Sequence, residues 1–202
     1  MDELLTTLGN DSIYEEIIKS NLEDRRIVLN NNIDSSIIED VILHILRWNQ
    51  EDKGKDKENR KPIWLYINSN GGDPISGFNA LDIIQNSETP VNGVILSCAA
   101  SMAGYLIMGC AKRYCFVNSI ILIHDGEIGA QNSTSKMKDT MKFFDAMEER
   151  TKQFVLDNTK ITSEFYDRIY QKEYYIFGNE EGKELGIIDY VIGEDVSLSE
   201  IL

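Results

Sequence analysis

The fold is indicated first by residues 63–74, which read IWLYINSNGGDP. The apolar run from Ile63 to Ile67 is typical of a buried strand, and the Asn, Ser and Gly residues after it are typical of a tight turn. A helical period follows, with apolar residues at Ile75, Phe78, Leu81 and Ile84. This stretch therefore predicts one strand–turn–helix unit of an α/β fold.

The rest of the chain repeats this alternation. Further strands are predicted at residues 26–29, 94–96, 115–123 and 187–192. Further helices are predicted at residues 37–46, from about residue 101, and over residues 132–158, the last with an apolar stripe of Met137, Met141, Phe144, Met147 and Phe154. We interpret residues 47–62 as an exposed loop. Because strands that alternate with helices form βα units, we expect a mostly parallel sheet buried on both faces.

The chain has 202 residues, with 34 Asp and Glu against 20 Lys and Arg, and a formal net charge of −14. A chain of this length predicts one domain whose core needs no disulfide or metal to hold it. The negative charge argues against binding to nucleic-acid phosphates and to an anionic membrane.

Neither the cysteines nor the N-terminus suggests export. Cys98, Cys110 and Cys115 form no CxxC pair, so we interpret them as small buried residues in a reducing compartment. The first five residues are acidic, whereas a secretory signal would be basic. We therefore expect a cytoplasmic protein.

Residues 89–111 contain no charged side chain and are long enough to span a bilayer. Pro90 and the glycines at positions 93, 104 and 109 interrupt the apolar residues. A buried strand that runs into a buried helix fits this content better than a membrane span.

Three features of the sequence suggest chemistry. Ser101 is expected where a strand turns into a helix, where a serine is either a nucleophile or a helix N-cap. The Gly71-Gly72 turn either presents N–H groups to a ligand or only connects a strand tightly to a helix. His124 ends an apolar strand beside a turn and is well placed to act as a base, whereas His44 is interpreted as a solvated surface residue. With only two histidines, no metal site is predicted.

Taken in order, these motifs resemble the ClpP family, the proteolytic subunits of the ATP-dependent Clp protease. The resemblance extends over residues 26–193. It is carried by residues 67–72 (INSNGG), 99–102 (AASM), 113–119 (RYCFVNS), 123–124 (IH) and 186–189 (GIID).

The resemblance implies a ClpP/crotonase-like α/β fold of repeated αββ units, with a mostly parallel sheet and a protruding handle helix. It also implies a serine endopeptidase that hydrolyses unfolded polypeptides or peptides inside a ring-shaped chamber, without a cofactor. Ser101 would be the nucleophile and His124 the general base, and the N–H groups of Gly72 and Met102 would form the oxyanion hole.

The resemblance further implies a homo-oligomer of stacked heptameric rings, with an AAA+ unfoldase as partner. The peptidase domain would cover residues 26–202 and include the handle helix at about residues 130–158. Residues 1–25 match the axial segment of the family poorly and are treated as a divergent N-terminal segment.

The third member of the catalytic triad is not evident. Counting back from residues 186–189 places Tyr174 at the position of the family's aspartate, and one inserted residue places Glu173 there. We favour Glu173, because a carboxylate can stabilise an imidazolium whereas tyrosine stays neutral below its usual pKa of about 10. Asp167, Asp125 or no acid at all are the alternatives.

If no acid is present, the chain would be a catalytically impaired structural or regulatory subunit. A crotonase-type acyl-CoA enzyme would use the Gly-Gly turn but would have no use for Ser101 and His124. A Ser–Lys dyad with Lys112 is not needed, because His124 already supplies a base.

Overall fold

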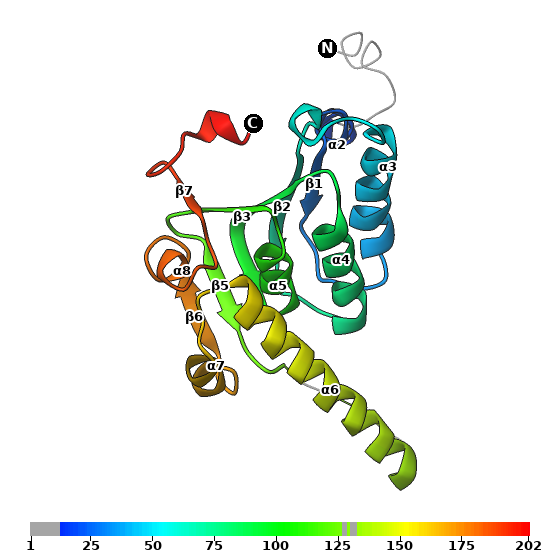
Figure 1. Cartoon of the computed structure of the whole chain (residues 1–202), viewed down its shortest axis with the longest axis vertical. Helices are drawn as coiled ribbons and strands as arrows, with labels where there is room; N and C mark the ends of the chain where they lie inside the picture. Colours follow the sequence, from blue (N-terminus) through cyan, green and yellow to red (C-terminus); the bar gives the residue numbers. More distant parts are fainter. Residues whose placement is uncertain (1–12, 127–128, 130–132) are drawn as a thin grey trace, which may run out of the picture.

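The computed structural model describes residues 13–126, 129 and 133–202. Its strands are β1 (Arg26–Leu29), β2 (Ile63–Ser69), β3 (Val91–Ala100), β4 (Lys112–Phe116), β5 (Ile120–Ile123), β6 (Tyr174–Phe177) and β7 (Tyr190–Ile192). Its α-helices are α2 (Ile13–Glu23), α3 (Leu43–Glu51), α4 (Pro74–Asn86), α5 (Met102–Met108), α6 (Thr134–Asn158), α7 (Ser163–Ile169) and α8 (Glu181–Glu184) (Figure 1). A π-helical turn, η1 (Ile38–Ile42), precedes α3, and two short 3₁₀ turns are η2 (Lys57–Asn59) and η3 (Leu198–Glu200).

The strands form one mostly parallel sheet, as predicted. The order is β1-β2-β3-β4-β7, and every pair along this path is parallel. The long strand β3 pairs with β4 through residues 92–95 and with β5 through residues 98–100. β6 is the antiparallel exception and pairs only with β5. β5 and β6 therefore form a branch at the end of β3, beside Ser101.

The two faces of the sheet are covered differently. Along β2, Ile63, Leu65 and Ile67 belong to the main core together with residues of the helices. On the opposite face Tyr66 packs with Ile201 from the C-terminal segment, and its hydroxyl donates a hydrogen bond to the Ile201 carbonyl. Trp64 is only partly buried there. Both faces of β2 therefore carry buried residues, as expected, but helices pack on one face and the short C-terminal segment packs on the other.

Two predicted boundaries of secondary-structure elements were wrong. Residues 47–62 are not all loop, because α3 continues to Glu51, Trp48 is buried, and Asp52 has no exposed surface. Residues 115–123 are two strands. The buried Ser119 forms the turn between them, accepting a hydrogen bond from the Phe116 N–H and donating one to the Ile95 carbonyl. The elements α7, β6 and α8 were not predicted.

The uncharged stretch 89–111 forms β3 and α5, as expected. Among the described helices, none has the length and apolar content needed to cross a bilayer. Cys110 and Cys115 are buried and Cys98 is half-buried, and all three are free thiols.

The longest helix, α6, projects away from the rest of the molecule (Figure 1). Its buried residues, Thr151 and Val155, lie near its C-terminal end. The helix matches the expected handle from residue 134 onward, while residues 130–132 lie outside the described residues. Of the expected N-terminal segment, residues 13–23 form α2 and residues 1–12 are likewise outside the described part.

Candidate active site

Ser101 lies between β3 and α5 in a strained backbone conformation. Its φ of 53° and ψ of −126° are unusual for a residue with a side chain. The conformation costs on the order of 1–3 kcal/mol. Its N–H donates a 2.9 Å hydrogen bond to the Leu122 carbonyl of β5, which holds the turn in place. Such strained strand-to-helix turns present the nucleophile of many hydrolases.

The Gly71-Gly72 turn packs directly against Ser101. A Cβ on Gly71 would lie 2.6 Å from the Ala100 carbonyl oxygen and 2.8 Å from Ser101 Cβ. A Cβ on Gly72 would lie 2.2 Å from the Ile33 carbonyl oxygen. Both residues also have positive φ, 87° and 148°. Only glycine allows the turn to approach Ser101 this closely.

Two backbone donors near Ser101 are available to a ligand. Neither the N–H of Gly72 nor that of Met102 has a backbone acceptor among the described residues. Met102 is the first residue of α5, where an N–H has no acceptor within the helix. Both residues line the same cavity as Ser101. This arrangement can stabilise negative charge that develops on an oxygen beside the serine.

His124 follows β5 and contacts Glu173, which precedes β6. The two strands are antiparallel with Ile123 opposite Tyr174, so the next residues, His124 and Glu173, also lie opposite each other. His124 Nδ1 is 2.9 Å from Glu173 Oε1. A carboxylate at this distance accepts a hydrogen bond from Nδ1–H and leaves Nε2 free to accept a proton. The His124 side chain is 21% exposed and that of Glu173 60% exposed.

None of the other candidates for the acid makes a hydrogen bond to His124 among the described residues. The Tyr174 hydroxyl donates to Glu181 Oε1 at 2.5 Å. The Asp167 carboxylate binds Lys152 Nζ at 2.6 and 2.9 Å. Asp125 is exposed and lines the cavity, but no hydrogen bond joins it to His124 among the described residues.

Ser101 and His124 both line a cavity of about 560 Å³. No direct hydrogen bond joins their side chains among the described residues. Catalytic hydrogen bonds are often long in ligand-free enzymes and shorten when substrate binds. The structure therefore brings the candidate nucleophile and the candidate base to one cavity, without a hydrogen bond between their side chains among the described residues.

The wall of this cavity opposite Ser101 was not predicted from the sequence. It comes mainly from α6 and from the end of α7, and includes Phe144, Met147, Glu148, Thr151 and Tyr170. Phe144 and Met147 belong to the predicted apolar stripe of the long helix. Periodicity places residues on one face of a helix, but it does not show which part of that face meets a site formed by other strands. Among the described residues, no group of three or more His, Cys, Asp or Glu is arranged to hold a metal ion.

The model of the Clp protease family matches residues 9–195. This match covers most of the chain, including every residue of the site described above. The mixed α/β architecture with its mostly parallel sheet is consistent with the ClpP/crotonase-like fold. The chain belongs to the Clp protease family.

Proposed function

We propose that this protein is a serine endopeptidase of the Clp type. Ser101 acts as the nucleophile, His124 as the general base, and Glu173 as the acid that orients His124. The single observation that carries the proposal is the meeting of Ser101, His124 and the two free N–H donors at one cavity. Membership of the Clp protease family supports the same chemistry.

In the proposed reaction, Ser101 Oγ attacks the carbonyl carbon of the scissile peptide while His124 Nε2 takes the hydroxyl proton. The C–N bond then breaks, and the proton passes from Nε2 to the leaving amine. A water molecule attacks the acyl-enzyme by the same route and releases the acid product. Glu173 accepts the Nδ1–H hydrogen bond throughout, which holds the imidazole and stabilises its protonated form.

The tetrahedral intermediate carries its negative charge on the former carbonyl oxygen. We assign the N–H groups of Gly72 and Met102 to this oxygen, because neither has a backbone acceptor among the described residues. Loss of one such donor typically costs about 3 kcal/mol in the transition state.

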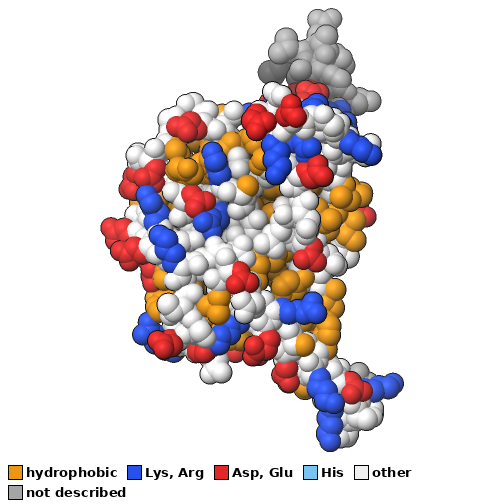
Figure 2. All heavy atoms as spheres, in the orientation of Figure 1, with side chains coloured by type: hydrophobic (Ala, Val, Ile, Leu, Met, Phe, Trp, Pro, Cys, Tyr) orange, Lys and Arg blue, Asp and Glu red, His pale blue; other side chains and the backbone are white. Residues whose placement is uncertain are grey.

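We further propose that the substrates are unfolded polypeptides or peptides, cleaved inside a chamber of stacked rings in the cytoplasm and delivered by an AAA+ unfoldase. The exposed apolar side chains on α6 support assembly. Met141 and Phe143 are 46% and 49% exposed. Apolar side chains gather where this helix leaves the rest of the molecule (Figure 2).

The test is covalent labelling with a fluorophosphonate, followed by peptide mapping of the assembled protein. We expect an adduct on Ser101, and no adduct and no peptidase activity in Ser101→Ala. Ser97→Ala is the matched control, because Ser97 is an exposed serine on β3, the strand that leads to Ser101. It should label and cleave like the wild type.

A catalytically impaired structural subunit is the second candidate. The observation that favours it is the lack of a direct hydrogen bond between Ser101 and His124. An assembled sample that shows neither labelling at Ser101 nor peptidase activity would support this candidate and reject the peptidase.

A further inference from the structure

The cavity beside Ser101 is acidic. Among the described side chains that line it are two carboxylates, Asp125 and Glu148, and no Lys or Arg. Neither carboxylate has an ion-pair partner among the described residues. The described lining of the cavity therefore carries two carboxylates that no ion pair with a described Lys or Arg balances.

The electrostatics of Glu148 support this description. Its pKa is raised, first by desolvation and then by the nearby charges of Asp145, Asp125 and Glu149. Desolvation, followed by the charges of Glu148 and Asp125, also raises the pKa of the Tyr170 hydroxyl to about 12. A bound cation would relieve the repulsion among these carboxylates.

The same cavity has an apolar wall. Phe78 from α4, Met102 from α5, and Phe144 and Met147 from α6 line it. Glu148 directly follows Met147 on α6, so apolar surface and a carboxylate adjoin each other there. The side chains of Lys and Arg combine a long alkyl stem with a charged end, and they bury the stem against apolar surface while the charge stays near water or a carboxylate.

A polar wall completes the cavity. Tyr105 lines it and is only 6% exposed. Thr151 and Tyr170 lie on the same cavity. Their hydroxyls can accept hydrogen bonds from a cationic head group.

We propose that this cavity selects peptides with Lys or Arg as the residue whose carbonyl Ser101 attacks, and that Glu148 recognises the positive charge. The apolar wall holds the alkyl stem of that residue. The proposal rests on the peptidase function proposed above and names the substrate class of the same site.

The test uses blocked peptides that are identical except at that residue, which is Lys, Arg, norleucine or Glu. Norleucine has the alkyl stem of lysine without its charge, so the ratio of kcat/KM for the Lys and norleucine peptides isolates recognition of the charge. An ion pair at a partly exposed site predicts a ratio of about two to five for the wild type. We expect the Glu peptide to be the poorest substrate.

Two variants of Glu148 make the test specific. Glu148→Gln should bring the ratio close to one, mainly through KM, and Glu148→Lys should favour the Glu peptide over the Lys peptide. Glu149→Gln is the matched control, because it removes the same charge from the next residue of α6, which does not line the cavity. It should keep the wild-type ratio.

The outcomes separate the two proposals. If Ser101 is labelled by the fluorophosphonate and the norleucine peptide is cut as well as the Lys peptide, the inference about Glu148 is overturned and the peptidase function stands. If Glu148→Gln and Glu149→Gln lower the ratio equally, Glu148 has no specific role. If Ser101 is not labelled and no peptide is cut, both proposals are overturned.

Discussion

Glu173 is distinguished from the other carboxylates around the cavity by one contact, the 2.9 Å between its Oε1 and His124 Nδ1. A carboxylate here fixes the tautomer that leaves Nε2 able to take the proton of Ser101. Its side chain is mostly exposed, so little of the fold depends on it. Glu173 is therefore a positioning residue in the proposed mechanism.

We expect Glu173→Gln to lower kcat by up to roughly 10⁴-fold, because an amide can hold the imidazole in the wrong tautomer. KM and the urea unfolding midpoint should change little. Tyr174→Phe, at the other position suggested by the sequence, should retain activity because the Tyr174 hydroxyl binds Glu181. Full turnover in Glu173→Gln would reject the assignment of the acid.

Gly71 offers a second test of the site at single-residue scale. We expect Gly71→Ala to abolish activity and to destabilise the fold by about 1–3 kcal/mol or more, because positive φ and a clash with the Ala100 carbonyl act together. Gly54→Ala is the control, since Gly54 also has positive φ but has nothing near its Cβ position. Urea unfolding and peptide hydrolysis measure both effects. Equal behaviour of the two variants would show that packing against Ser101 is unimportant.

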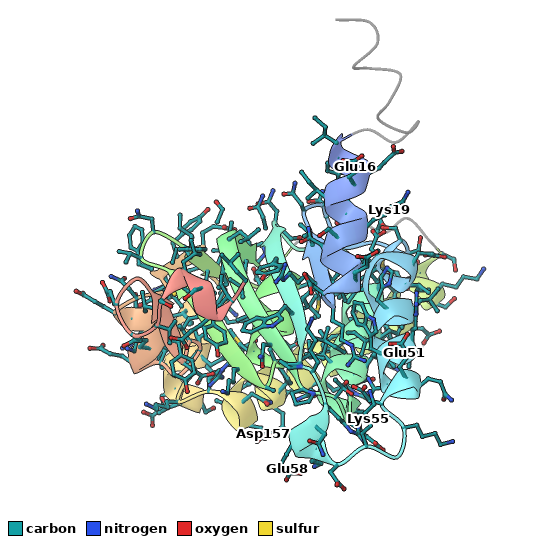
Figure 3. The ribbon with its side chains drawn as sticks, turned by 90° about the horizontal axis from the view of Figure 1, so that it is seen from above. Glu16, Lys19, Glu51, Lys55, Glu58 and Asp157 are labelled. Carbon is teal, nitrogen blue, oxygen red and sulfur yellow. The ribbon has the colours of Figure 1, made fainter. Side chains whose placement is uncertain are left out.

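Between elements, the largest buried ionic contact joins the end of α3 to the start of β1. Asp52 accepts two hydrogen bonds from the Arg25 guanidinium, at 2.5 and 2.9 Å, and one from Thr89 Oγ1 at 2.9 Å. Asp52 is fully buried. It also contacts Lys55 Nζ at 2.7 Å, and Lys55 lies on the loop after α3 (Figure 3). This network holds part of residues 47–62, which were interpreted from the sequence as an exposed loop, against the sheet.

We expect Asp52→Asn to destabilise the protein by about 3–5 kcal/mol, because it leaves the buried Arg25 charge with only the longer 3.4 Å ion pair to Glu51 Oε2 among the described residues. Lys55→Ala removes a half-exposed partner of Asp52 and should lower the free energy of unfolding by at most about 1 kcal/mol. Urea unfolding measures both. A loss for Asp52→Asn no larger than that for Lys55→Ala would contradict the importance of the buried pair.

The same pair predicts the acid sensitivity of the fold. The pKa of Asp52 is lowered, mainly by its hydrogen bonds with Arg25. A carboxyl whose pKa is lower in the folded state stabilises the protein fully above its unfolded pKa of about 3.9, and loses this contribution as pH falls toward the folded value. The wild type should therefore lose stability more steeply below about pH 4 than Asp52→Asn does. Parallel curves of unfolding free energy against pH would contradict this.

For the molecule as a whole, the most unusual feature is the exposed apolar surface on α6. It extends beyond the body, and its exposed Met141 and Phe143 have no covering element in the described structure. Exposed apolar side chains on a projecting helix are typical of an assembly surface. The net charge of −14 favours solubility but does not predict an assembly.

We expect the purified protein to be a multi-subunit assembly, and Phe143→Lys to shift it toward smaller species, as measured by mass photometry. Lys142→Gln is the control, because it changes an exposed neighbouring residue without removing apolar surface. It should keep the native mass. The circular dichroism spectrum should be the same for both variants, since the buried residues of α6 lie closer to its C-terminal end. An unchanged mass for Phe143→Lys would show that this part of α6 is not an assembly surface.

The strand–turn–helix units, the long helix, and the placement of Ser101 and His124 at the ends of strands could all be predicted from the sequence. These features depend on residues close together in the chain, so periodicity and turn composition report them directly. The sequence favoured Glu173 over Tyr174 only on chemical grounds. Which of the two faces His124 depends on the register of β5 with β6, which are about fifty residues apart in the chain, and so required the folded structure. A shift of one residue in that register reverses which side chain points to the site. The folded structure likewise decided that Asp52 is buried and that α6 supplies the cavity wall, since both depend on packing between distant segments.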